Sequence, residues 1–135
     1  RTEIYRPLFE REDCPIRKDI LPSFDALFYE PFYQFMRQQL LAHEMEKAHE
    51  LNADVVTVLH IAPAHNNDFC RVTSPQLINL GEIATSVWGK LVKPGGRFFS
   101  VSTEQLFGNV SAERFPEIKT WLDYIRARYT WLWAL

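Results

Sequence analysis

A long helix followed by an apolar strand constrains the fold of this chain more than any other feature. Residues 31–51 contain no glycine or later proline, and residue types that favour helices dominate them. Pro31 suits the first helical turn because it has no N–H group to leave unpaired. Asn52 ends this predicted helix. Residues 55–61 are then β-branched and apolar almost without interruption, a pattern typical of a strand covered on both faces.

The second half of the chain predicts a second strand and two further helices. Ser74 and Pro75 have the residue types of a helix N-cap and first helical position, so we expect a helix over 75–92. Residues 97–101 then predict a strand, and residues 116–129 a final helix. Two strands joined through a helix lie parallel in one sheet. The predicted fold class is therefore α/β: a long helix, a parallel βαβ unit and a C-terminal helix.

At 135 residues the chain is one domain at most. Residues 1–30 show no helical or strand period, so they are expected to form an irregular N-terminal arm before a helix-strand-helix-strand-helix region over 31–135. Two strands alone leave too much edge unpaired, which predicts an incomplete sheet. Residues 1–30 could donate a strand, or upstream sequence, a partner chain or a homodimer could complete it. With its start at Arg1, the chain is expected to be a single domain or the C-terminal part of one.

The long helix carries the first functional signal. Positions 34, 38, 41, 45 and 48 are spaced 4-3-4-3 and lie along one stripe. The last three are apolar and are expected to face the core, whereas the first two are Gln34 and Gln38, with Arg37 beside them. These amides either pair with buried backbone or line a polar site at the N-terminal end of the helix. A second apolar side, also expected to be buried, carries Phe32, Phe35, Met36 and Leu40.

Composition excludes few functions. The formal net charge of −2 argues for no general affinity for nucleic acid, although it leaves room for a local basic patch. No apolar run approaches the ~20 residues of a membrane span, and no signal peptide is present, so a cytoplasmic protein without membrane contact is expected. His60, near the end of the first predicted strand, forms a cluster with His65, Asp68 and Cys70 after it, but the spacing matches no zinc pattern.

Two stretches of the sequence resemble a known family. They are Tyr33-Gln34-Phe35-Met36-Arg37 with Leu40-Leu41 on the long helix, and residues 58–66 on the strand and its exit. With the order of predicted elements, they resemble the C-terminal half of the PD-(D/E)XK superfamily of restriction-endonuclease-like nucleases, and within it a group of bacterial restriction endonucleases. The resemblance covers about residues 28–107.

The resemblance implies a metal-dependent DNA endonuclease. In that superfamily an Asp and an E-x-K pair, which precede the long helix, hold divalent metal and activate a water. Residues 1–30 contain no E-x-K, and Glu117-Ile118-Lys119 falls in a predicted helical turn, where the two side chains do not meet. Mg²⁺ and DNA are therefore implied by the resemblance alone. No metal ligand is identified, the catalytic residues are unknown, and the chain is expected to be inactive by itself.

The resemblance also implies positions for the DNA-binding residues. In related nucleases a glutamine or arginine on the long helix faces the metal site or the DNA phosphates, and Gln34, Arg37 and Gln38 stand in matching places. His65 and Asn66 follow the strand at the sheet edge where open α/β sheets bind ligands. The alternative function is a non-catalytic α/β interaction module that binds a protein partner through Trp121, Trp131 and Trp133.

Overall fold

The chain folds as two units, which are described separately here. The computed structural model describes residues 2–66, 68 and 70–133. Unit 1 contains Arg1–His60 and Asn67–Phe99, and unit 2 contains Ile61–Asn66 and Ser100–Leu135. The boundary between the units crosses both strands of the sheet.

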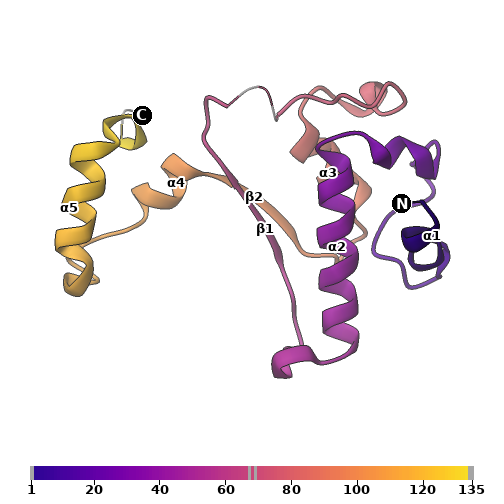
Figure 1. The fold of residues 1–135 in the computed structure, drawn as a ribbon, viewed down its shortest axis with the longest axis horizontal. Coiled ribbons are helices and arrows are strands. Elements are labelled where there is room, and N and C mark those ends of the chain that lie inside the picture. Colours follow the sequence, from indigo (N-terminus) through magenta and orange to yellow (C-terminus); the bar gives the residue numbers. More distant parts are fainter. Residues whose placement is uncertain (1, 67, 69, 134–135) are drawn as a thin grey trace. The chain divides into compact units, whose positions relative to one another are not determined.

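The long helix, α2, is present over Phe32–Lys47 (Figure 1). It begins one residue later than predicted, because Pro31 is its N-cap rather than its first helical residue. It ends earlier than the predicted Leu51. His49 and Leu51 have φ values of 48° and 55° in the left-handed region, which a right-handed helix cannot accommodate. Glu50–Asn52 instead forms a separate 3₁₀ turn before the chain enters the first strand.

The apolar side of α2 forms the centre of the core of unit 1. Phe32, Phe35, Met36 and Leu40 are all buried, as predicted. The ring of Phe35 lies 5.9 Å from that of Trp88 and 5.5 Å from that of Phe98, centroid to centroid. The predicted stripe through position 41 is wrong, because the side chain of Leu41 is 60 % exposed. The buried stripe lies about half a helical turn away.

The sheet contains two parallel strands, β1 (Val58–Ala62) and β2 (Phe98–Ser102), joined through helix α3 (Ala84–Leu91). The N–H of Val58 donates to the Arg97 carbonyl oxygen at 2.9 Å. This arrangement confirms the predicted α/β class with an incomplete sheet. The predicted helix over 75–92 is too long, because Gly81 has φ 147° and interrupts it after a 3₁₀ turn at Ile78–Leu80.

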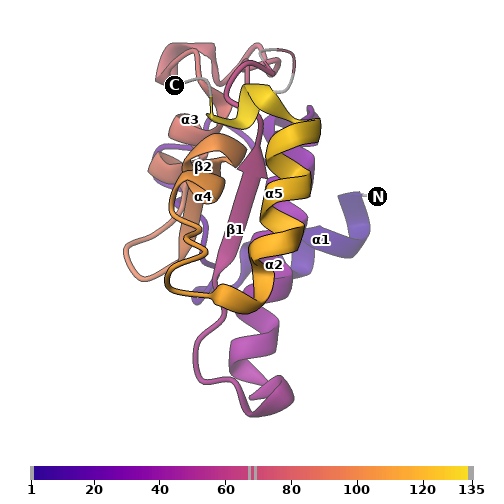
Figure 2. The same ribbon diagram turned by 90° about the vertical axis from the view of Figure 1, so that its left-hand side faces the viewer.

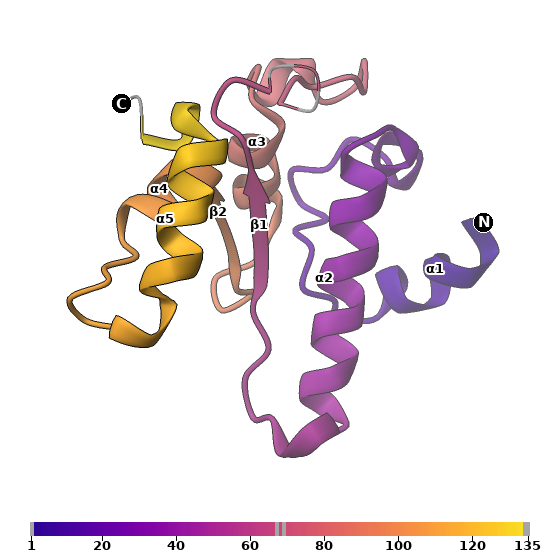
Figure 3. The same cartoon turned by 60° about the vertical axis from the view of Figure 1, so that its left-hand side comes forward.

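The N-terminal residues form a helix where an irregular arm was predicted. Helix α1 covers Thr2–Glu10 and lies beside α2 in Figures 1 and 3. Tyr5, Leu8 and Phe9 pack against the core of unit 1, which supplies the stabilisation that Pro7 inside the helix removes. A second short segment, the 3₁₀ helix Phe24–Phe28, adds Phe24, Ala26 and Leu27 to that core. The described N-terminal residues therefore donate helices to the fold and no strand to the sheet.

Unit 2 is built from the ends of the two strands and two helices, α4 (Thr103–Gly108) and α5 (Lys119–Arg128), shown in Figure 2. A capping box begins α4: Gln105 N–H donates to Ser102 Oγ, and Ser102 N–H donates to Gln105 Oε1, each at 3.0 Å. The predicted helix over 116–129 is present as a 3₁₀ turn at Pro116–Ile118 followed by α5. The 3₁₀ helix Thr130–Trp133 ends the described chain.

Candidate nucleic-acid interface

A hollow lies between α1 and α2 in unit 1. Its volume is about 410 Å³. The three helix residues predicted from the sequence, Gln34, Arg37 and Gln38, all line it. The remaining wall is mostly apolar and comes from both helices: Tyr5, Leu8, Leu40, Leu41 and Glu44. The structure thus brings the predicted polar group together beside an apolar surface.

The guanidinium of Arg37 is held at the edge of this hollow and remains exposed. Its Nη1 donates to Gln34 Oε1 at 3.3 Å, and its Cζ lies 5.5 Å from the centroid of the Tyr33 ring. Gln34 is itself oriented by its Nε2, which donates to Glu30 Oε1 at 3.2 Å. Within the described residues no carboxylate forms an ion pair with Arg37. Its positive charge is therefore available to a ligand.

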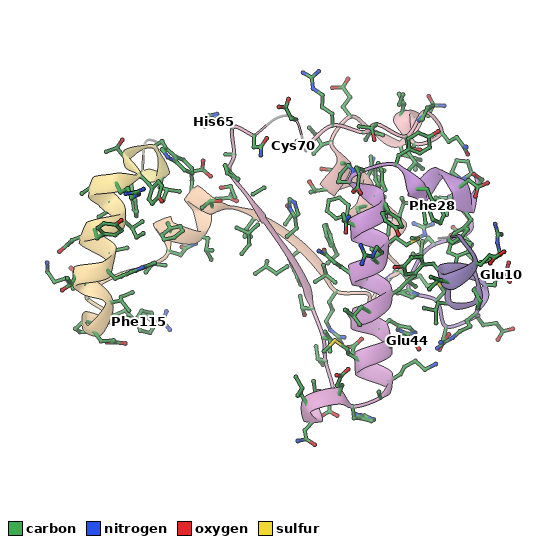
Figure 4. The ribbon with its side chains drawn as sticks, viewed as in Figure 1. Glu10, Phe28, Glu44, His65, Cys70 and Phe115 are labelled. Atoms are coloured by element: carbon green, nitrogen blue, oxygen red, sulfur yellow. The ribbon has the colours of Figure 1, made fainter. Side chains whose placement is uncertain are left out.

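The acidic side of the hollow is neutralised by a neighbouring arginine. Glu44, labelled in Figure 4, forms an ion pair with Arg11 Nη1 at 2.9 Å. Arg11 also holds both oxygens of Asp13, at 2.9 and 2.8 Å, and Lys47 adds a further contact to the same carboxylate. The hydrogen bonds from Arg11 and then from Lys47 hold the pKa of Asp13 well below its usual range. Glu44 therefore contributes no unbalanced negative charge near Arg37.

The exposure of Gln34 and Gln38 changes the reason for assigning them to a site. Helical spacing predicts both side chains on a core-facing stripe, in which an unpaired amide is costly. Both side chains are exposed in the structure, so neither needs a buried partner. Their place in the hollow, next to Arg37, is what supports a binding role.

His65 and Asn66 lie in the turn that follows β1, and both belong to unit 2. His65 is exposed (labelled in Figure 4), and the N–H of Asn66 donates to the Pro63 carbonyl oxygen at 3.1 Å. The turn is anchored by Glu104, whose carboxylate accepts the Ala64 N–H at 3.0 and 3.2 Å. Burial opposes ionisation of Glu104, but these hydrogen bonds, with smaller contributions from Ser102 and His65, hold its pKa below the usual value.

Sequence reasoning missed Glu104, which is only 1 % exposed. The available signal was its position two residues after Ser102, in the first turn of α4, where helix N–H groups attract carboxylates. Tyr5 and Leu8 were also missed, because α1 was not predicted. The E-x-K sequence at 117–119 was correctly set aside: it spans a 3₁₀ turn and the start of α5, and Lys119 Nζ donates to Asp123 at 2.6 Å.

The described residues do not provide a fit for Mg²⁺. Across residues 2–66, 68 and 70–133, no three His, Cys, Asp or Glu side chains are grouped so that they could hold a metal ion. His60 instead packs edge-on against Phe35, with ring centroids 5.3 Å apart, and burial lowers its pKa. No catalytic step through a metal is therefore derived from this structure.

Fold and site together define an open α/β protein with an arginine and two amides beside an apolar hollow. A comparison with known protein families identifies the family to which this α/β protein belongs. Residues 1–130 match the family described as "Restriction Endonuclease associating with ARP", and the chain belongs to that family. No curated protein and no solved structure matches the chain. The relationship to restriction endonucleases expected from the sequence is thus confirmed at the level of the family.

No described helix is long and apolar enough to cross a lipid bilayer.

Proposed function

We propose that this chain is the DNA-binding part of a metal-dependent endonuclease domain of the PD-(D/E)XK type. The observation that carries the proposal is Arg37: exposed, oriented by Gln34 and Tyr33, and without a carboxylate ion pair among the described residues. A guanidinium held in this way suits a DNA phosphate, which it can bind through two parallel hydrogen bonds. Membership of a restriction-endonuclease family supports the same substrate.

The residues beside Arg37 in the hollow could contact the DNA next to the phosphate that Arg37 is proposed to bind. Gln38 lies one position from Arg37 and presents an amide with both a donor and an acceptor. The ring of Tyr5 and the side chains of Leu8 and Leu41 provide an apolar surface next to it. Arg37 would therefore position the backbone, with Gln38 and Gln34 as secondary contacts. His65 and Asn66 are proposed as further DNA contacts from unit 2.

DNA cleavage is proposed to require catalytic residues that are not among the residues the structure describes. The Asp and E-x-K pair of PD-(D/E)XK nucleases supply the Mg²⁺ ligands, and the described residues do not group carboxylates in this way. The chain by itself is accordingly expected to bind DNA without cutting it.

The test is DNA binding by the wild-type chain and two arginine variants. Arg37→Ala should weaken binding of a fluorescein-labelled duplex by about tenfold, the equivalent of about 1.4 kcal/mol, because one charge-assisted phosphate contact is lost. Arg17→Ala is the matched control: Arg17 is in the same unit but is paired with Asp19 at 2.7 Å and does not line the hollow. Fluorescence anisotropy measures both. Equal affinity for wild type and Arg37→Ala would overturn the assignment.

A second candidate function has support in unit 2. Trp121 and Trp131 are 48 % and 44 % exposed, which is unusual for such large apolar side chains. All three predicted interface tryptophans also contact a ring within the unit. Trp121 stacks on Phe107 with ring centroids 5.9 Å apart, Trp131 meets Tyr129 edge-on at 6.4 Å, and Trp133, which is less exposed, packs against Phe107 at 5.9 Å. A protein-interaction module would use the first two. Sedimentation velocity should then show concentration-dependent association that Trp131→Ser removes; a monomer at every concentration would argue against self-association.

A further inference from the structure

The C-terminal end of unit 2 exposes three aromatic side chains around one arginine. Tyr124, Tyr129 and Trp131 are 56 %, 36 % and 44 % exposed. Tyr124 and Arg128 lie four positions apart on α5 and so share one side of that helix, and the other two rings follow at its end (Figure 2). We call these four residues the Arg128 cluster. Exposed rings gathered in one place are unusual on a folded chain and mark a candidate binding surface.

Contacts within the Arg128 cluster fix the positions of its members. Arg128 Nε donates to the Tyr129 hydroxyl oxygen at 3.2 Å, and Arg128 Cζ lies 5.6 Å from the centroid of the same ring. The contact with Tyr129, and after it one with Tyr124, raises the pKa of Arg128. The rings of Tyr129 and Trp131 meet edge-on, with centroids 6.4 Å apart. The three rings are thus held beside a guanidinium and stay open to solvent.

The positive charge at this end of unit 2 is not paired with a carboxylate. Neither Arg126 nor Arg128 forms an ion pair among the residues of the unit that the structure describes. Arg126 instead lies over the ring of Trp133, with its Cζ 5.6 Å from the ring centroid. Asp123, which precedes both arginines, is held by Lys119 Nζ at 2.6 Å. The last turn of a helix favours cations, but that preference does not account for the exposed rings beside them.

The other acidic side chains described in unit 2 are occupied or lie toward the opposite end of α5. The Glu104 carboxylate is buried and accepts the Ala64 N–H. Glu117 lies in the 3₁₀ turn before α5, so the length of that helix, roughly 15 Å at about 1.5 Å per residue, separates it from Arg128. Glu113 precedes that turn. The charge next to the exposed rings is therefore positive.

An anionic ligand with flat groups matches both features of this surface. Arginine binds phosphate oxygens, and the guanidinium of Arg128 has more N–H donors than its contacts with the two tyrosines use. Exposed aromatic rings stack on nucleobases, provided that those bases are not already stacked on each other in a duplex. A phosphopeptide would meet the arginines and leave the rings unused.

We propose that the Arg128 cluster binds single-stranded DNA, with bases stacked on Trp131 and Tyr124 and a backbone phosphate on Arg128. Arg126 contributes a second positive charge at the same end of α5. The choice of DNA rests on the proposed DNA-binding function. The surface itself is separate, because it belongs to unit 2 and contains none of the residues that line the hollow around Arg37.

The test is fluorescence anisotropy with a fluorescein-labelled oligo(dT) strand. Trp131→Leu keeps an apolar side chain and removes the ring, so it should weaken binding of oligo(dT) by at least about fivefold, the loss of one stacked base. Trp131→Phe keeps a ring and should retain most of the affinity. Arg128→Gln should lower the slope of log affinity against log salt by about 0.7, the value for one phosphate of a single strand. Binding of a duplex should be unchanged in Trp131→Leu.

Two controls separate base stacking from the general attraction of an anion. Tyr29→Leu makes a similar change at an exposed ring of unit 1, outside the Arg128 cluster and the hollow around Arg37, and should leave binding unchanged. An abasic oligomer, which carries the phosphates without the bases, should bind wild type at least about fivefold more weakly than oligo(dT). If Trp131→Leu fails to fold, as judged by circular dichroism, Tyr124→Leu removes another exposed ring and should weaken binding similarly.

Equal affinity of wild type and the two leucine variants of the cluster for oligo(dT) overturns the proposal, as does equal binding of the abasic oligomer. Self-association that Trp131→Leu removes, with unchanged affinity for oligo(dT), would assign the rings to a protein interface instead. The Arg37 assignment is judged separately. A duplex affinity that falls in Arg37→Ala, with an oligo(dT) affinity unchanged in Trp131→Leu, contradicts the Arg128 cluster alone, and the reverse pattern contradicts the Arg37 assignment alone.

Discussion

At the residue scale, two adjacent glutamines of α2 have opposite environments. Gln38 is exposed beside Arg37 in the hollow between α1 and α2, whereas Gln39 is only 2 % exposed. A step of one residue turns a helix by about 100°, enough to move a side chain from solvent into the interior. The chemical identity of a glutamine therefore says little about its role until its side of the helix is known.

Asp13 gives a pH prediction at this scale. Its pKa is depressed, mainly by the hydrogen bonds from Arg11 and Lys47, so the folded chain binds this proton less readily than the unfolded chain. The ion pairs then stabilise the fold above about pH 4, the usual pKa of an Asp, and this contribution is lost as the pH falls below that value. The difference in urea midpoint between wild type and Asp13→Asn should accordingly shrink between pH 7 and pH 3. The effect should be small, because the group is exposed. A difference that does not change with pH would contradict this reasoning.

At the scale of elements, the structure separates what a sequence pattern can predict from what it cannot. The long helix was recognisable because Phe32–Lys47 lacks glycine and proline. Strand β1 was predicted only in part: it begins at Val58 rather than at residue 55, and it is not covered on both faces, because Leu59 and Ile61 are 51 % and 45 % exposed. Helix α1 was not predicted because Pro7, which disfavours a helix interior, lies within it. Its stabilisation comes from packing against the core, which cannot be read from local sequence. The break at Gly81 likewise depends on a backbone angle rather than on a residue type.

The corrected orientation of α2 predicts different costs for two alanine substitutions. Phe35→Ala should lower the free energy of unfolding by about 3–5 kcal/mol, because Phe35 is 2 % exposed and contacts Trp88 and Phe98. Leu41→Ala, six positions later on the exposed side, should change it by less than about 0.5 kcal/mol. Urea denaturation followed by circular dichroism measures both. Similar losses for the two variants would restore the stripe predicted from the sequence.

The turn after β1 depends on the first turn of α4. Glu104→Gln should make the Ala64 amide exchange its hydrogen about tenfold faster at pH 7, because an ionised acceptor is replaced by a neutral one. In wild type the protection should be complete above the usual pKa of Glu, about 4.3, and should fall as the pH drops below it, since the pKa of Glu104 is depressed. Hydrogen-exchange mass spectrometry or NMR follows both. Unchanged exchange in the variant would mean that Glu104 does not hold the turn.

At the scale of the whole molecule, the sequence predicted the class of fold and a relationship to restriction endonucleases, and it suggested part of the candidate site. Gln34 and Gln38 were predicted from helical spacing, and these two with Arg37 from a resemblance; the structure groups all three in one hollow of unit 1. The apolar wall from Tyr5 and Leu8 required knowledge of where α1 packs. The burial of Gln39 and the exposure of Tyr124 required knowledge of packing, which no spacing rule provides. Long-range packing, rather than local preference, accounts for each of these omissions.

The central claim is that Arg37 contacts a DNA phosphate, and salt dependence tests it most directly. Affinity for a short labelled duplex should be measured between 50 and 300 mM KCl for wild type and Arg37→Ala. Each neutralised phosphate adds about 0.9 to the slope of log affinity against log salt. The slope for Arg37→Ala should be shallower by about that amount, whatever the DNA sequence. Equal slopes for the two proteins, or binding by neither, would contradict it.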